Sequence, residues 1–152
     1  MTHINAPIFN SALVALANAG QKVMDIYASN KFDTKQKADQ SPVTIADIQS
    51  SKIIEHHLNQ TGVPIICEES EIPPYEVRTK YKRFWLVDPL DGTKEFINRN
   101  GEFTINIGLI EDGQPIWGGI LIPAQNVLYW GGPAYGSFKA LLNSDISIVH
   151  NF

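Results

Sequence analysis

From residue 102 to residue 132 the sequence alternates between short apolar runs and turn residues, and this pattern limits the fold more than any other feature. The runs FTINIGLI, PIWGGILI and VLYWGG are separated by the short segments EDGQ and PAQN. Connections this short join strands that run antiparallel. The pattern therefore predicts a β-meander, and YGSFK is a candidate for one more strand.

Two predicted helices precede this meander. Apolar residues recur at helical spacing from Phe9 to Tyr27, with alanine and glycine between them. The segment SPVTIADIQSSKIIEHHLNQTG predicts a second helix, because Thr44 and Asp47 resemble a capping box and Gly62 is a natural stop. Helices followed by an antiparallel sheet predict an α+β fold with the helices packed on the sheet.

Composition excludes several classes of protein. The chain has 152 residues, of which 43% are hydrophobic and 18% charged, which suits one packed domain. A net charge of −4 argues against nonspecific nucleic-acid binding. The single cysteine, Cys67, excludes an intrachain disulfide, and we expect a small buried hydrophobe rather than a redox switch. We expect the lysines, Lys37 among them, to lie on solvated faces, and we expect no signal peptide or transmembrane segment.

Acidic residues stand where the predicted strands end. VPIICEE ends in Glu68 and Glu69, and RFWLVD ends in Asp88. If these strands lie side by side, Glu68 and Asp88 come to the same edge of the sheet. The Pro-Leu-Asp-Gly turn that follows would fold Asp91 back toward Asp88 and aim the carbonyl of Leu90 at the same point.

Such a group of carboxylates indicates a site for divalent cations. Without nearby Arg or Lys the carboxylates repel one another, so they need shifted pKa values or bound cations. Oxygen ligands suit Mg²⁺, Mn²⁺ or Ca²⁺, and two such ions would activate a water and stabilise the leaving oxygen of a phosphate ester. The alternative is three unrelated acidic turns, and these residues alone leave both interpretations open.

Two further features point to an anion near this edge. Gly92 and Thr93 open the short helical segment TKEFI, whose N–H groups would face a phosphate, and the Thr93 hydroxyl would orient a water. Asp47 shares a predicted helix face with Ile54 and Leu58, where a carboxylate is costly unless it is paired or bound to metal. The alternative for Asp47 is a cap that faces solvent.

Three segments, SPVTIAD, CEES and WLVDPLDGTKEFINRNGEFTINIGLI, resemble the lithium-sensitive, magnesium-dependent phosphatases of the inositol monophosphatase superfamily. The variant DPLDGTKEFI followed by NRNGEFT is similar to the CysQ-type 3′(2′),5′-bisphosphate nucleotidases. Those enzymes remove the 3′-phosphate of adenosine 3′,5′-bisphosphate to give AMP and phosphate. The resemblance runs from about residue 8 to residue 138 and implies a sugar-phosphatase-like N-terminal domain and a hydrolase of sulfur assimilation.

The resemblance also implies the metal ligands. It implies two or more Mg²⁺ ions, with Mn²⁺ as an alternative and Li⁺ as an inhibitor. Glu68 would bind the first ion and Asp88 would bridge the two ions. Leu90 would give its carbonyl to the first ion, and Asp91 would bind the second.

The resemblance further implies how substrate is held. Gly92 and Thr93 would bind phosphate through their N–H groups, and Thr93 would help to polarise the attacking water. Asp47 would pair with Thr93 or serve a further, weaker ion. Two further roles follow from position in the sequence and not from the resemblance: Glu69, next to the end of the ligand strand, is expected to support the ligands, and Lys94, next to the phosphate seat, is a candidate contact for the substrate's second phosphate. The implied catalytic set is Glu68, Asp88, Asp91, Thr93 and Asp47, and the implied substrate contacts are Glu68, Leu90, Asp91, Gly92 and Thr93.

The end of the sequence departs from the superfamily pattern. Members of the superfamily are longer and continue into a second α/β domain with a W-D-x-A motif, whose Asp completes the second metal site. Nothing in KALLNSDISIVHNF matches that motif. We therefore expect residues 1–139 to form the N-terminal metal-binding phosphatase domain, with the second domain absent and residues 140–152 as an unrelated or disordered tail.

The leading expectation is thus a magnesium-dependent 3′(2′),5′-bisphosphate nucleotidase acting on a small phosphorylated nucleotide and not on nucleic acid. One alternative is an inositol monophosphatase or another sugar phosphatase. Another alternative is a truncated, noncatalytic metal-binding fragment. We expect a cytoplasmic protein, with peripheral association at the inner face of the cell membrane and a homo-oligomer as further alternatives.

Overall fold

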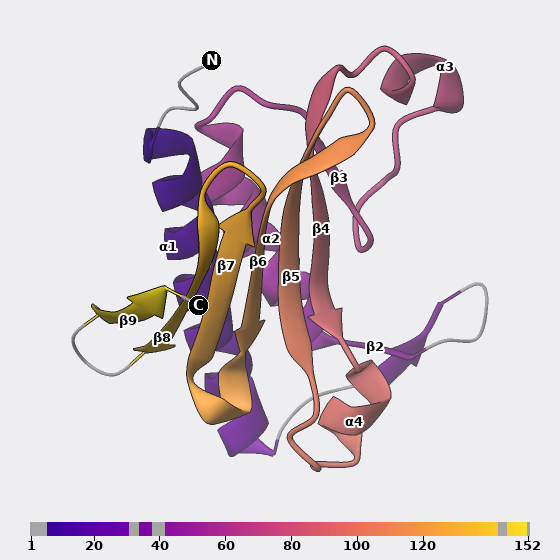
Figure 1. The fold of residues 1–152 in the computed structure, drawn as a ribbon. Coiled ribbons are helices and arrows are strands. Elements are labelled where there is room, and N and C mark those ends of the chain that lie inside the picture. The colour runs from indigo at the N-terminus through magenta and orange to yellow at the C-terminus, as the bar shows by residue number, and fades with distance from the viewer. Residues whose placement is uncertain (1–5, 31–33, 38–41, 143–145, 152) are drawn as a thin grey trace.

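Two long helices cover one face of a mixed β-sheet (Figure 1). The computed structural model describes residues 6–30, 34–37, 42–142 and 146–151. Within these ranges the helices are α1 (Ala6–Ser29), α2 (Ile45–Asn59), α3 (Tyr75–Arg78) and α4 (Thr93–Ile97), with a 3₁₀ turn η1 (Pro123–Gln125). The predicted α+β class, with helices packed on a sheet, is confirmed.

The main sheet has the strand order β3-β4-β5-β6-β7-β8-β9. From β4 onward each strand pairs antiparallel with the next, so the predicted meander is confirmed. Asp112 and Gly113 join β5 to β6 with φ of 47° and 76°, as the favoured two-residue hairpin turn requires. The strands are β3 (Ile65–Cys67), β4 (Arg83–Asp91), β5 (Thr104–Glu111), β6 (Gln114–Ile122), β7 (Val127–Gly132), β8 (Gly136–Leu142) and β9 (Ile146–Asn151).

The pair β3–β4 is parallel, in a sheet that was predicted as antiparallel. The connection between the two strands is long enough to contain α3, so β4 can return to the same end and run in the same direction as β3. Cys67 stands opposite Val87, and the N–H of Glu68 donates to the Val87 carbonyl at 3.1 Å. Glu68, directly after β3, and Asp88, inside β4, therefore lie at the same edge of the sheet, as the sequence predicted.

Helix α1 packs through a stripe of small and branched side chains. Ala12, Leu16, Ala19 and Val23 are fully buried at the three- and four-residue spacing of one helix face. The alanines bring the helix backbone close to its neighbours, and α1 lies against α2 and against β5 and β6. This packing fixes α2, which carries Asp47, relative to the sheet.

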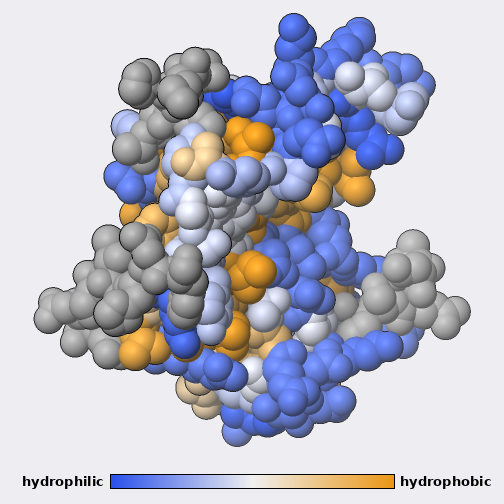
Figure 2. All heavy atoms as spheres, in the orientation of Figure 1, coloured by the Kyte–Doolittle hydropathy of each residue, from blue (hydrophilic) through white to orange (hydrophobic). Residues whose placement is uncertain are grey.

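The two faces of the sheet differ in burial. Trp85 and Val87 of β4 are buried on the helix side, whereas Leu86 between them is 49% exposed. Ile120 of β6 and Leu141 of β8 are also exposed, at 46% and 44%. Figure 2 shows this second face, on which apolar patches lie among polar ones. The alternation therefore leaves apolar side chains on the face opposite the helices.

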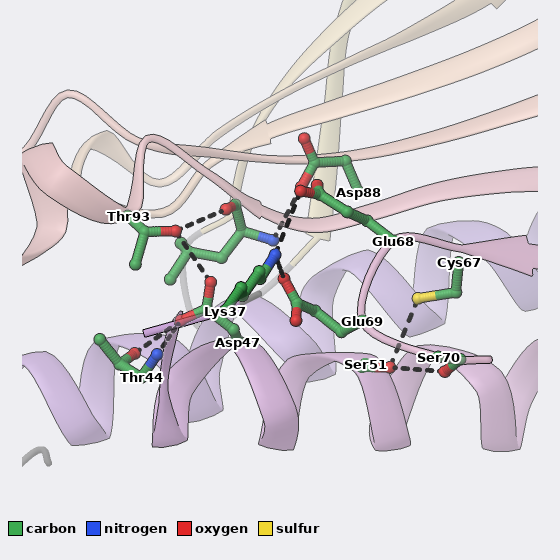
Figure 3. Close-up of polar contacts among 11 residues, drawn as sticks. Lys37, Thr44, Asp47, Ser51, Cys67, Glu68, Glu69, Ser70, Asp88 and Thr93 are labelled. Carbon is green, nitrogen blue, oxygen red and sulfur yellow. Dashed lines mark hydrogen bonds and ion pairs between the residues drawn. The ribbon is translucent and has the colours of Figure 1, made fainter. Parts of the chain in front are cut away.

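A small separate sheet lies beside the start of α2. Strand β1 (Thr34–Gln36) pairs antiparallel with β2 (Pro42–Thr44). Strand β2 leads directly into α2, and Lys37 follows β1. This small sheet thus brings a lysine toward the acidic edge (Figure 3).

The predicted tail, residues 140–152, begins inside β8. Ala140 is 1% exposed, and β9 pairs antiparallel with β8. Residues 140–142 therefore belong to the sheet, and the domain boundary at residue 139 stays a prediction. Among the helices of the described ranges, none combines the length and hydrophobicity needed to span a membrane.

Candidate metal centre

The residues predicted from the sequence to form a site lie at one edge of the sheet. Glu68 follows β3, Asp88 and Asp91 end β4, Thr93 begins α4, and Asp47 lies in the first turn of α2. Figure 3 shows Glu68, Asp88, Thr93 and Asp47 gathered where these elements meet. Segments from four parts of the chain thus deliver oxygen atoms to one region.

Asp47 is a buried carboxylate whose two oxygens are both hydrogen-bonded. Its exposed fraction is 0%. Its Oδ2 accepts from the N–H and the hydroxyl of Thr44, at 2.8 and 2.7 Å, which completes the predicted capping box. Its Oδ1 accepts from the hydroxyl of Thr93 at 2.9 Å. The alternative of a cap that faces solvent is therefore wrong.

The turn after Asp88 depends on Gly92. The pairing of β4 with β5 is irregular between Asp88 and Asp91, so the chain bends away from the sheet there. Gly92 has φ of 91°, and a Cβ at this position would lie 2.9 Å from the carbonyl oxygen of Glu102. Only glycine suits this left-handed and crowded position, and α4 begins at the next residue, Thr93.

Leu90 and Thr93 form the centre of this turn. The Leu90 side chain is buried, and its N–H donates to Asp88 Oδ1 at 3.3 Å. The hydroxyl of Thr93 also lies 3.4 Å from the Leu90 carbonyl oxygen. The Leu90 carbonyl oxygen therefore lies beside Thr93, and its role as a metal ligand stays a prediction.

Asp88 carries the most perturbed carboxyl group at this edge. Burial raises its pKa to about 7, and the negative charges of Glu68 and Asp91 act in the same direction. A hydrogen bond with Glu68 raises the pKa further, while the N–H of Leu90 lowers it. Three carboxylates are thus close enough for their charges to interact, and without a cation a proton on Asp88 relieves the repulsion.

Lys37 supplies a positive charge at this edge, which corrects the expectation that it lies on a solvated face. Its Nζ lies 3.2 Å from Glu68 Oε1 and also bonds to Glu69 Oε1. Burial lowers the pKa of Lys37, but the hydrogen bonds to Glu69 and Glu68 outweigh it and leave the pKa raised. Burial raises the pKa of Glu69, and Lys37 offsets part of that effect. The sequence contains no signal for this contact, because 31 residues separate Lys37 from Glu68.

The donor set has the chemistry of a site for a hard divalent cation. Glu68, Asp88, Asp91 and the Leu90 carbonyl offer only oxygen atoms and an excess of negative charge, which suits Mg²⁺ or Ca²⁺. In the part of the chain that the structure describes, no three acidic, His or Cys side chains close around one point. Of the predicted convergence, the structure shows the interaction of Asp88 with Glu68 and with the charge of Asp91. The convergence of all four donors and the metal-ligand roles stay predictions.

Cys67 lies behind Glu68 and has the buried environment that was expected. It is 2% exposed, and its Sγ lies 3.4 Å from the hydroxyl of Ser51. Burial raises the pKa of its thiol, which keeps the thiol protonated at neutral pH. Ser51 also approaches Ser70, at 3.5 Å, and Ser70 bonds to Glu55. These contacts join the end of β3 to α2.

Comparison with known proteins identifies the family. The profile of the inositol monophosphatase family matches residues 5–146, nearly the whole chain. The chain belongs to the inositol monophosphatase family. Over 115 residues it is 51% identical to the 3′(2′),5′-bisphosphate nucleotidase CysQ of Escherichia coli K12, an alignment that covers 74% of this chain and 46% of that protein. The chain thus spans about half the length of the curated relatives that it matches.

Solved structures of the family have the same fold. The crystal structure of CysQ from Bacteroides thetaiotaomicron superposes with a TM-score of 0.79 at 37% identity, over 97% of this chain and 55% of that one. An IMPase/NADP phosphatase complexed with NADP and Ca²⁺ superposes with a TM-score of 0.75 at 18% identity, over 87% of this chain and 50% of that one. At that identity the second structure shows a shared fold alone.

Proposed function

We propose that this chain belongs to a Mg²⁺-dependent phosphomonoesterase that removes the 3′-phosphate of adenosine 3′,5′-bisphosphate to give AMP and phosphate. The observation that carries the proposal is the Thr93–Asp47 hydrogen bond, 2.9 Å long, beside the crowded Glu68–Asp88 pair. The identity of 51% to a CysQ nucleotidase supports the choice of substrate within the family. The family membership itself leaves inositol phosphates and other sugar phosphates as alternatives.

In this proposal, Glu68, Asp88, Asp91 and the Leu90 carbonyl hold the cations. Bound Mg²⁺ would lower the pKa of a water and offset the negative charge of the phosphate. The carboxylates supply the negative charge that makes this edge attractive to such ions. Mn²⁺ as an alternative ion and Li⁺ as an inhibitor belong to the same proposal.

Thr93 would orient the attacking water. Its hydroxyl proton points to Asp47 Oδ1, so the lone pairs of its oxygen are free to accept a hydrogen bond from water. Asp47 is itself held on its other oxygen by Thr44, at 2.8 and 2.7 Å. Because Asp47 is fully buried and fixed, Thr93 has one favoured hydroxyl direction, and the water takes up a defined position.

The start of α4 would hold the phosphate. Gly92 adopts the left-handed conformation that turns the chain into α4, and the N–H groups of Gly92 and Thr93 lie at this end. Lys94, the next residue, is exposed and is the cation that we propose as the contact for the substrate's second phosphate. A second phosphate distinguishes adenosine 3′,5′-bisphosphate from an inositol monophosphate, so Lys94 would favour the nucleotide.

Phosphate release from adenosine 3′,5′-bisphosphate and from inositol 1-phosphate, measured with Mg²⁺, tests the function. We expect the bisphosphate to be preferred, and Asp88→Asn to lower turnover by about 100-fold or more. The matched control is Asp112→Asn in the β5–β6 turn, which should leave turnover unchanged. Full turnover by Asp88→Asn would contradict the proposed metal site, and a preference for inositol 1-phosphate would favour a sugar phosphatase.

A noncatalytic metal-binding unit is the second candidate, because no three acidic, His or Cys side chains of the described residues close around one point. Calorimetry with Mg²⁺ on the 152-residue chain separates the two candidates. Mg²⁺ binding that is lost in Asp88→Asn, without phosphate release, would favour the noncatalytic unit. Mg²⁺ binding together with phosphate release would favour the enzyme.

A further inference from the structure

A buried serine joins α2 to the turn that carries the proposed metal ligands. Ser50 is 0% exposed, and its hydroxyl donates to the carbonyl oxygen of Pro89 at 2.6 Å. Three residues earlier on the same helix face, Asp47 accepts from Thr93. Helix α2 therefore holds this turn at two points, one on each side of Leu90.

The peptide between Pro89 and Leu90 links Ser50 to Asp88. Its carbonyl accepts from Ser50 at 2.6 Å, and its N–H, that of Leu90, donates to Asp88 Oδ1 at 3.3 Å. Because the peptide group is planar, holding the carbonyl also sets the direction of the N–H. Hydrogen bonds in series polarise one another, so the contact from Ser50 makes the Leu90 N–H a better donor.

We propose that Ser50 is a positioning residue for the candidate metal centre. It fixes the Pro89–Leu90 peptide so that the Leu90 N–H supports the Asp88 carboxylate. It also fixes the backbone on the N-terminal side of Leu90, and the Leu90 carbonyl oxygen lies 3.4 Å from the Thr93 hydroxyl. The consequence for metal affinity rests on the proposed function, whereas the orientation of the peptide does not. The alternative is a purely structural role, in which Ser50 only provides a hydrogen-bond donor for the buried Pro89 carbonyl.

The neighbouring Ser51 provides a matched control. It lies on the same helix and is 5% exposed, but its hydroxyl faces Cys67 and Ser70, at 3.4 and 3.5 Å. Ser51→Ala therefore removes a buried hydroxyl from α2 without touching the turn after Asp88. Ser50→Ala removes one oxygen atom at the adjacent position and leaves the Pro89 carbonyl without that donor. A difference between the two variants reports on the turn and not on α2 in general.

The first measurement is amide hydrogen exchange at Leu90 by NMR in the metal-free protein, corrected for the global stability of each variant. We expect exchange to be about 10-fold faster in Ser50→Ala and unchanged in Ser51→Ala. Ser50→Thr, which keeps the hydroxyl, should restore slow exchange. Unchanged exchange at Leu90 in Ser50→Ala would overturn the proposal, whether or not the protein binds metal.

The second measurement is the affinity for Mn²⁺, followed by electron paramagnetic resonance. We expect binding about fivefold weaker in Ser50→Ala and equal to the unmodified chain in Ser51→Ala. If the unmodified chain binds Mn²⁺ and the two variants bind it equally well, Ser50 contributes to stability only, and its positioning role is overturned. If the unmodified chain binds no Mn²⁺, the proposed function fails, and the exchange rates at Leu90 still decide how the peptide is held.

Discussion

Two acidic residues at this edge of the sheet, Asp47 and Asp88, are stabilised in different ways. Asp47 is fully buried and accepts three hydrogen bonds, two from Thr44 and one from Thr93. Asp88 accepts one N–H, at 3.3 Å, and faces the negative charges of Glu68 and Asp91. The surroundings of Asp47 satisfy its charge with donors from the chain, whereas those of Asp88 raise its pKa to about 7.

This difference indicates two roles. Asp47 has a structural role in the site, whereas Asp88 and its neighbours are suited to bind a cation. A buried charge with its full set of donors is stable as it stands. A carboxylate with few donors and like-charged neighbours becomes stable when it takes up a proton or a cation. Substitutions of the two residues should therefore change the stability of the metal-free protein in opposite directions.

The largest effect is expected for Asp47→Ala. The substitution removes the capping box of α2 and leaves the N–H of Thr44 and the hydroxyl of Thr93 without their acceptor. Loss of a hydrogen-bonded buried carboxylate should lower the free energy of unfolding by about 3 kcal/mol. Urea unfolding in EDTA measures this, with Asp112→Asn as the control, since asparagine suits the left-handed position in the β5–β6 turn. A loss below about 0.5 kcal/mol would mean that Asp47 is not held as described.

Asp88→Asn should instead stabilise the metal-free protein at pH 8. Asparagine keeps an oxygen that can accept from the Leu90 N–H but removes the charge that burial, Glu68 and Asp91 disfavour. After allowance for screening by water, the gain should be about 1–2 kcal/mol in urea unfolding. Stabilisation by added Mg²⁺ should disappear in the same variant. Destabilisation of the metal-free variant would contradict the crowding of charge at Asp88.

The pH dependence of stability tests the same crowding without a substitution. Folding raises the pKa of Asp88 from an ordinary value near 3.8 to about 7, so between these pH values the folded chain holds a proton that the unfolded chain has lost. The stabilisation is complete at low pH and is lost as pH rises through about 7. The raised pKa of Glu69 acts in the same direction. Thermal unfolding in EDTA should give a Tm a few degrees lower at pH 8 than at pH 5, a difference worth about 1 kcal/mol.

Asp88→Asn is also the control for this pH effect. The difference in Tm between pH 5 and pH 8 should shrink in the variant, because its side chain cannot titrate. An equal difference in Asp88→Asn and in the unmodified chain would assign the pH dependence to other groups. Comparing the pH series of the two proteins thus shows whether the proton is bound at Asp88. The substitution at a single pH measures only how much the Asp88 charge destabilises the protein.

Local patterns made much of the fold predictable. The Asp112-Gly113 turn and the strands on either side of it follow from short-range rules, and so does the capping box of Thr44 and Asp47. Glu68 and Asp88 came to one edge because each ends an apolar run of a neighbouring strand. The carboxyl ends of parallel strands meet by geometry, so that part of the site needed no knowledge of side-chain packing.

The contacts that the sequence did not reveal all join distant segments. Lys37 meets Glu68 through the β1–β2 hairpin, and Ser50 meets Pro89 across the packing of α2 on β4. Neither residue stands in a pattern, because a lysine after a polar strand or a serine in a helix is ordinary by itself. The contact between Asp47 and Thr93 also joins distant segments, and it was predicted only through the family resemblance, because short-range patterns left Asp47 either paired or facing solvent.

Lys37→Met should give the smallest effect. It tests how far a positive side chain stabilises the carboxylates next to Asp88 when no metal ion is bound. The Lys37 Nζ contacts Glu68 and Glu69, and the Glu69 side chain is 9% exposed. The contact with two carboxylates should be worth about 1 kcal/mol in EDTA, whereas Arg83→Met, which breaks a pair with the single, less buried carboxylate of Glu111, should cost about 0.3 kcal/mol. The Lys37→Met loss should shrink when Mg²⁺ is added, since the ion would balance the same carboxylates. Equal losses in the two variants, with and without Mg²⁺, would show that Lys37 acts as an ordinary surface lysine.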